Sequence, residues 1–117
     1  MSAMNLSTSV RNAQNGVAVI DIQGEVTGLA ESILTDAYNQ ASAVSAQAVV
    51  LNFSGLAYMN SSGIGLLVTL LIRAQRHKQR LLAYGLSEHY RQIFELTRLN
   101  EAIGIFASEG EALASVR

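Results

Sequence analysis

The chain has 117 residues, with eight Lys and Arg against nine Asp and Glu, and its formal net charge is −1. Half of the residues are apolar and only 15% are charged, which fits one compact globular domain and excludes a disordered chain. The absence of Cys excludes disulfides and thiolate metal sites, and the small net charge gives no reason to expect a nucleic-acid partner.

The first half of the chain predicts two strands with a helix between them. Residues 1–10 are small and polar, and we expect a loose start that can add an edge strand. Residues 17–22 are β-branched and stop at Gly24, which predicts a strand. Thr27 can cap the following helix. The apolar residues of that helix recur at helical spacing: Ala30, Ile33, Leu34, Ala37, Ala41 and Val44.

The second strand of this half is a nearly continuous apolar run, residues 48–53, which is typical of a strand covered on both faces. We expect it to end in a turn at residues 54–55. The later elements are a helix over residues 64–78, a strand over residues 80–84 stopped by Gly85, a helix capped by Ser87, a strand over residues 103–106, and a short helix behind a capping box of Ser108 and Glu111.

This alternation of strands and helices predicts the fold class. It implies βαβ units and a largely parallel sheet. We therefore expect an α/β fold, a single domain over residues 1–117, with a mixed, mostly parallel sheet of four to five strands and about four helices. Residues 1–16 have no basic segment before an apolar core, and the apolar stretch 63–72 has about half the length of a spanning helix. We expect a soluble, cytoplasmic protein without membrane insertion.

Two loops are candidates for a functional site, because sites in such sheets lie beyond the carboxyl ends of the strands. These loops are residues 24–28 and residues 58–65. Ser61 is placed to be the N-cap or the first residue of an apolar helix, where unpaired amides and the helix dipole favour an anion by about 0.3–1 kcal/mol. The fold would thus tolerate a phosphoryl group on Ser61. The alternative is an ordinary cap at Ser61, with a spare hydroxyl on Ser62.

The helix after Ser61 is apolar nearly all round. Leu66 and Leu70 lie off the row that the helical period assigns to the core, which is Ile64, Leu67, Val68 and Leu71. Either a neighbouring helix covers Leu66 and Leu70, or they form an exposed contact patch beside Ser61.

Basic residues gather after this helix, at Arg73, Arg76, His77, Lys78 and Arg80. We interpret them as a solvated helix end in which cations complement the negative end of the dipole. A surface for nucleic acid would need more charge and interleaved aromatic residues.

Enzyme motifs are absent from the sequence. There is no G-x-x-x-x-G-K-[ST] phosphate loop and no G-x-S-x-G elbow, and His77 and His89 are the only histidines. We expect no enzymatic activity, no metal site and no cofactor, and both histidines facing solvent. A small enzyme or ligand-binding domain would need a concave pocket with convergent polar groups.

The order of strand, serine pair and apolar helix resembles a known family. Residues 49–67 read VVLNFSGLAYMNSSGIGLL, and they resemble the signature of STAS domains, specifically of bacterial anti-sigma factor antagonists. Residues 82–87 (LAYGLS) and 93–99 (IFELTRL) are similar to the family's second segment, and residues 24–26 (GEV) to its Gly-Glu-hydrophobic turn. The likeness covers roughly residues 17–113.

The resemblance implies a partner switch in transcription control. The unmodified domain binds an anti-sigma factor that is also a serine kinase, which phosphorylates the first serine of the pair and ends binding; a serine phosphatase restores it. The modified residue maps onto Ser61, with Ser62 as second choice. The contact surface maps onto Gly24, Glu25, Val26, Thr27, Gly28, Leu29, Asn60, Ser61, Ser62, Gly63, Leu66 and Leu70.

The chain departs from the family pattern at three positions. Asn60 stands where switching members usually have Asp, Thr27 where Asp is frequent, and Glu88 where Pro is frequent. Asn60 leaves a second interpretation open, a non-phosphorylated STAS interaction subunit of a signalling scaffold or transport complex. For either function we expect a monomer or weak homodimer.

Overall fold

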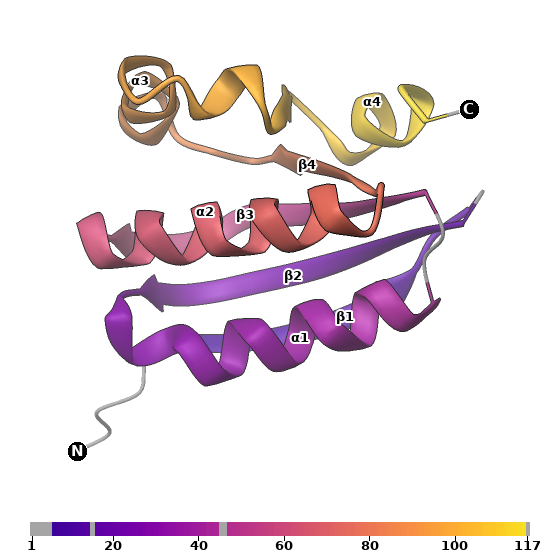
Figure 1. Ribbon diagram of the computed structural model, residues 1–117. Coiled ribbons are helices and arrows are strands. Elements are labelled where there is room, and N and C mark those ends of the chain that lie inside the picture. Colours follow the sequence, from indigo (N-terminus) through magenta and orange to yellow (C-terminus); the bar gives the residue numbers. More distant parts are fainter. Residues whose placement is uncertain (1–5, 15, 45–46, 117) are drawn as a thin grey trace.

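One mixed sheet forms the centre of the protein, and helices cover both of its faces (Figure 1). The computed structural model describes residues 6–14, 16–44 and 47–116. Over these residues the strands are β1 (Leu6–Asn12), β2 (Val17–Val26), β3 (Ala48–Met59), β4 (Arg80–Tyr84) and β5 (Gly104–Phe106). The α-helices are α1 (Glu31–Val44), α2 (Ser61–Arg76), α3 (Glu88–Leu96) and α4 (Glu109–Ala114), and the 3₁₀ turns are η1 (Gly28–Ala30) and η2 (Leu99–Glu101).

The strands lie in the sheet in the order in which they occur in the chain, β1-β2-β3-β4-β5. β1 is antiparallel to β2, and every other neighbouring pair is parallel. The expected single α/β domain with a mixed, mostly parallel sheet of four to five strands is confirmed. The expected edge strand is confirmed as β1, while residues 1–5 of the expected loose start lie outside the described residues.

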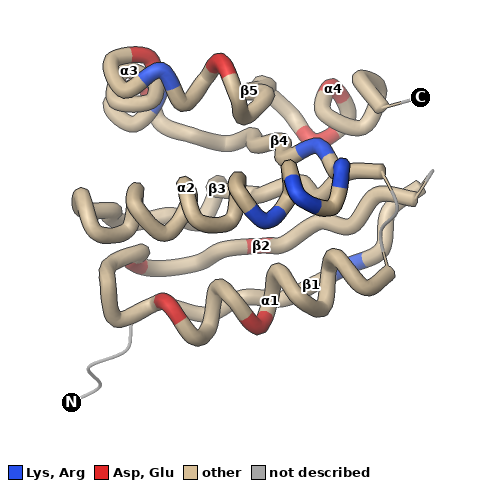
Figure 2. Tube along the Cα trace, in the orientation of Figure 1, with Lys and Arg blue, Asp and Glu red and all other residues tan. Residues whose placement is uncertain are grey.

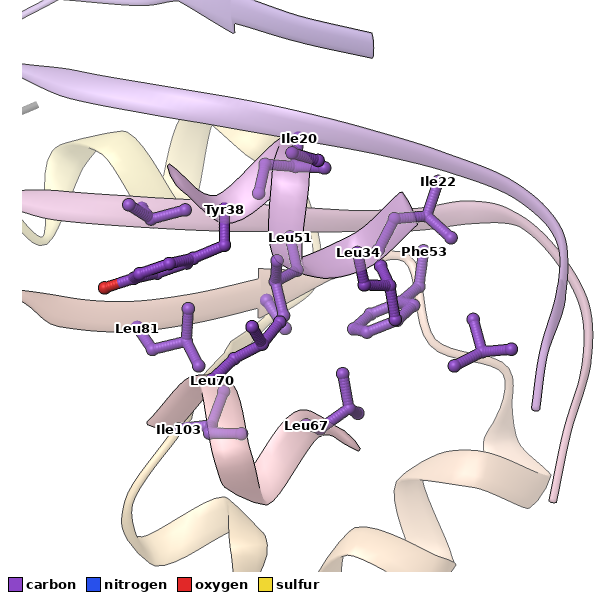
Figure 3. Close-up of a cluster of buried hydrophobic side chains, with 14 of the residues drawn as sticks. Ile20, Ile22, Leu34, Tyr38, Leu51, Phe53, Leu67, Leu70, Leu81 and Ile103 are labelled. Atoms are coloured by element: carbon purple, nitrogen blue, oxygen red, sulfur yellow. The ribbon is translucent and has the colours of Figure 1, made fainter. Parts of the chain in front are cut away.

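The main core lies between the sheet and the pair α1 and α2, which run side by side across one face (Figure 1). Alternate residues of β2 and β3 point into it, and Figure 3 shows Ile20, Ile22, Leu51 and Phe53 meeting Leu34, Leu67 and Leu70 from the helices. The ring of Phe94 from α3 meets Phe53 edge to face, with 6.4 Å between ring centroids. This core fixes α2, and with it the position of the serine pair.

A smaller apolar cluster lies on the opposite face, under α4. Ala112 and Val116 pack there against Val17, Val19 and Val50. Beyond α4 this face becomes polar.

A group of four polar residues, the Arg11 cluster, ties the two ends of the described chain together on this face. Arg11 of β1 donates to Asp21 of β2 (Nε–Oδ2 2.6 Å) and to Glu109 of α4 (Nη2–Oε1 2.7 Å), and the Tyr84 hydroxyl donates to Glu109 at 2.8 Å. Hydrogen bonds from Arg11 hold the pKa of Asp21 and of Glu109 below their usual values. Burial, followed by the bond to Glu109, raises the pKa of Tyr84 to about 12.

Both central strands are longer than predicted. β2 continues through Gly24 to Val26, and β3 continues through the expected turn at residues 54–55 to Met59. Gly24 lies at φ 105°, and the pairing of the two strands shifts register on either side of it. A side chain on Gly55 would lie 2.8 Å from Cγ of Gln23. The two glycines therefore sit at irregularities inside the pair and do not end the strands.

The helix starts follow the predicted caps with small changes. Thr27 accepts a hydrogen bond from the Leu29 amide, so it caps the 3₁₀ turn η1 that leads into α1. Ser87 caps α3 as predicted. Ser108 caps α4, but the carboxylate of Glu111 accepts from the amide of Ala107. None of the helices in the described part of the chain is long and apolar enough to cross a membrane.

The helical spacing predicted the buried residues of α1 and α2 with two kinds of error. Val44 and Val68, both expected in the core, are 57% and 37% exposed. Tyr38, which the spacing rule left out, is fully buried, and its hydroxyl donates to Gln79 at 3.1 Å. The histidines at 77 and 89 are exposed, as expected.

Candidate functional site

The candidate site forms where β2 and β3 end side by side. Glu25 pairs with Tyr58 and Val26 with Met59, and the Asn60 amide donates to the Val26 carbonyl at 3.3 Å. The structure thus brings together the two segments that the sequence singled out. They are paired strand ends followed by first helical turns, whereas the sequence predicted two open loops.

Asn60 caps helix α2, and Ser61 is its first residue. Oδ1 of Asn60 accepts a hydrogen bond from the Gly63 amide at 2.9 Å, and the Asn60 backbone is extended, with φ −104°. Of the two positions that the sequence allowed for Ser61, the first residue of the helix is correct. The side chain of Asn60 therefore makes the capping bond expected for a serine hydroxyl, and the Ser61 hydroxyl is not needed for it.

Both serines of the pair are exposed, but their surroundings differ. A side chain on Gly28 would lie 3.4 Å from Cβ of Ser62, so Ser62 stands against the η1 turn. Ser61 lies in the first turn of a 16-residue helix, where the dipole and the unpaired amides favour a negative group.

Gly63 holds the start of α2 close to β2. It is buried, and a Cβ at this position would collide with the carbonyl of Val26. The helix can approach the strand this closely only because residue 63 has no side chain. The position of Ser61 on the surface therefore depends on Gly63.

The contact residues expected from the resemblance differ in exposure. Leu29 is 69% exposed, and Gly28 is exposed beside the serines. Gly24, Glu25, Thr27 and Asn60 are half-buried.

Three expected contact residues point inward. Val26 is fully buried and Leu70 is 2% exposed, and Leu66 is partly buried against the core. The side chains of Val26 and Leu70 belong to the main core, and contact with a partner at these positions stays a prediction. Of the two alternatives for Leu66 and Leu70, coverage by neighbouring elements is correct.

Two large apolar residues that were not among the expected contact residues are exposed on β3 and α2. Tyr58 at the end of β3 is 48% exposed, and Ile72 of α2 is 45% exposed. Ser61, Gly65, Val68 and Ile72 are all exposed and follow one another at helical spacing, so they form one outward face of α2, here called the α2 outer face. The sequence does not indicate this face, because apolar residues occur on nearly all sides of α2. The structure identifies it by showing how the helix is rotated about its axis.

Tyr90 of α3 holds the end of β3 next to the site. Its hydroxyl accepts a hydrogen bond from the amide of Met59 at 2.9 Å, next to the capping residue Asn60. Nothing in the sequence indicates this bond.

One family model matches most of the chain. The family model described as STAS domain matches residues 9–112. An anti-sigma-B factor antagonist of Listeria monocytogenes is 24% identical over 108 residues, which are 92% of this chain and 95% of that protein.

Two solved structures show the same fold. The crystal structure of an anti-sigma factor antagonist from Mycobacterium paratuberculosis superposes with a TM-score of 0.77 at 24% identity, over 96% of this chain and 94% of that chain. The Bacillus cell fate determinant SpoIIAA in its phosphorylated form superposes with a TM-score of 0.64 at 24% identity, over 95% of this chain and 100% of that chain.

Proposed function

The chain belongs to the STAS domain family, and from this premise we propose that it is an anti-sigma factor antagonist that is switched off by phosphorylation of Ser61. In the unmodified state it binds an anti-sigma factor that is also a serine kinase, and so releases a sigma factor. The similarity to proteins named as antagonists supports the choice of partner.

The observation that carries the proposal is the exposed Ser61 hydroxyl in a helix already capped by Asn60. A kinase can reach this hydroxyl without breaking the cap. The kinase transfers the γ-phosphoryl group of ATP to Oγ of Ser61, ADP leaves, and the hydroxyl proton is lost to the kinase or to water. The helix start accommodates the new charge, so the fold persists.

The phosphate acts on the complex and leaves the fold intact. It adds about −1.5 to −2 charges at the start of α2, and Leu29 and Tyr58, from the two segments that meet there, are exposed apolar residues. Burying that charge in an interface costs free energy unless the partner supplies cations. Each 1.4 kcal/mol of such cost weakens binding about tenfold. A serine phosphatase would remove the phosphate and restore binding.

A binding assay with the cognate anti-sigma kinase tests this proposal. Wild-type protein should bind and then dissociate when ATP is added, with a mass increase of one phosphate on Ser61. Ser61→Ala should bind with or without ATP, and Ser61→Asp should bind at least about tenfold more weakly.

Ser62 provides the matched control, because it is the adjacent exposed hydroxyl. Ser62→Ala should still be phosphorylated and released. Equal binding by wild type and Ser61→Asp would disprove the switch, and phosphate on Ser62 alone would move it by one residue.

Asn60 favours a second candidate function, a STAS interaction subunit that is never phosphorylated. Its amide is neutral and is engaged with Gly63, whereas a carboxylate would offer a kinase a charged contact. Under this alternative the chain would bind its partner equally well with and without ATP. Protein purified from its own host would then carry no phosphate on Ser61.

A further inference from the structure

The C-terminal end of α2 carries a concentration of positive charge that the proposed function does not use. The sequence has no Asp or Glu between Asp36 and Glu88, although this segment holds four of the eight Lys and Arg. Figure 2 shows them gathered around the end of α2. The protein has a net charge of −1, so the local charge at this end of α2 is opposite in sign to the net charge of the protein.

Two of these four cations line a shallow hollow of about 420 Å³ that also contains an apolar residue. The hollow is lined by Thr69, Ile72, Arg73, Arg76 and His77. Ile72 is 45% exposed there. A side chain of medium size can therefore rest on Ile72 with cations on its flank.

The cations at this end differ in how far they are already engaged. Arg80 donates to the Ser115 carbonyl at 2.8 Å, which fixes it against the end of α4. Among the described residues, Arg76 and Lys78 form no ion pair. Complementing the helix dipole accounts for positive charge at this end, but it does not account for an exposed Ile72 among the charges.

We propose that this hollow is a second docking surface, and that its occupant is an acidic segment of a protein partner with an apolar side chain that packs on Ile72. Carboxylates of the segment would pair with Arg73 and Arg76. Ile72 in the hollow lies 11 residues along the helix from Ser61, or about 16 Å, so the proposal does not depend on the switch at Ser61.

Other anionic partners fit this surface less well. A nucleic acid would need a larger basic area with aromatic residues to stack on its bases. An anionic membrane is bound by clusters of about four to eight free Lys and Arg, and here Arg80 is already engaged. A protein segment uses the few cations and the exposed Ile72 together.

An NMR titration of the full chain, labelled with ¹⁵N, tests the proposal. The probe is a synthetic capped peptide in which Leu recurs at helical spacing and is flanked by Glu. We expect saturable shifts confined to the residues that line the hollow and their neighbours. Binding should be about tenfold weaker in Arg76→Glu, and weaker again in Ile72→Ser/Arg76→Glu.

Arg91→Glu is the matched control, because Arg91 is an exposed arginine on α3 and its reversal changes the net charge equally. It should bind the peptide like wild type. Equal weakening by Arg91→Glu, equal binding of a peptide with Lys in place of Glu, or shifts that avoid the hollow would each overturn the proposal. Vesicles rich in phosphatidylserine form a further arm, and binding to them without binding to the peptide would assign the surface to a membrane.

Discussion

At the scale of single residues, capping the helix and offering an exposed hydroxyl are carried out by two different residues, Asn60 and Ser61. Asn60 fills the cap, and Ser61 keeps an exposed hydroxyl in the first turn. The sequence could not assign the cap, since Asn and Ser both favour this position. The capping residue is the one whose backbone is still extended just before the helix. The strand pairing of Val26 with Met59 ends one residue before Asn60, so Asn60 takes the cap position.

Replacing Asn60 tests this division. Asn60→Ala should lower the free energy of unfolding by about 1 kcal/mol, because the Gly63 amide loses its acceptor. Asn60→Asp keeps the acceptor and places a negative charge at the positive end of the helix, so stability should rise by about 0.3–1 kcal/mol. Urea unfolding measures both changes, and Ser62→Ala should leave the midpoint nearly unchanged. A loss of stability in Asn60→Asp would contradict the capping role.

At the scale of elements, the centres of the strands and the caps at Thr27, Ser87 and Ser108 were predictable, whereas the strand ends and the helix faces were not. The runs at residues 17–22, 48–53 and 80–84 are encoded locally by apolar and β-branched residues. The extensions through Gly24 and Gly55 depend on a neighbouring strand that supplies hydrogen bonds across an irregular register. Such pairing is a property of tertiary structure, and both glycines resemble turn residues in the sequence.

The prediction of which side of α2 faces the core was wrong for a related reason. α2 is apolar around most of its circumference, so periodicity cannot tell Val68 from Leu70. The structure turns Leu70 inward and Val68 outward. The exposed apolar side chains of α2 are therefore those of the α2 outer face, whereas Leu66 is partly buried and Leu70 is buried.

Two glycines of α2 predict opposite responses to the same substitution. Gly63→Ala should destabilise the protein by about 1–3 kcal/mol, because the added methyl collides with the Val26 carbonyl and forces the helix away from β2. Gly65→Ala should stabilise it by about 0.5–1 kcal/mol, since a Cβ there meets only open space. Thermal unfolding of both variants measures the difference. Similar shifts in both would contradict the close approach at Gly63.

At the scale of the whole molecule, the Arg11 cluster couples stability to pH. The carboxylates of Asp21 and Glu109 have lowered pKa values in the folded state because Arg11 donates to both. The folded state therefore binds fewer protons than the unfolded state in mildly acidic solution. The stability that these groups contribute is present above the unfolded pKa of about 4, and it is lost as the pH falls through the folded values.

Urea unfolding between pH 7 and pH 3 measures this coupling. Because these groups are partly exposed, we expect Glu109→Gln to cost only about 1 kcal/mol at pH 7 and to flatten the decline toward pH 3. Tyr84 has the opposite sign: its raised pKa contributes stability below pH 10, which is lost as the pH rises toward 12. Tyr84→Phe should reduce the alkaline decline, to which burial of Tyr38 also contributes by raising its pKa, and it should change the acid decline less than Glu109→Gln does, because Arg11 still donates to Glu109. An unchanged acid profile in Glu109→Gln would show that other carboxylates govern it.

The bond between Arg11 and Glu109 also bears on how the protein matures on the ribosome. Every strand lies beside its neighbour in sequence, so the growing chain can add strands one at a time as they emerge. Arg11 can form its bond to Glu109 only late in synthesis, because this second partner follows it by 98 residues. Until then the edge strand β1 lacks its hydrogen bonds to α4. A polypeptide arrested before residue 109 should therefore expose β1 to proteases and chaperones.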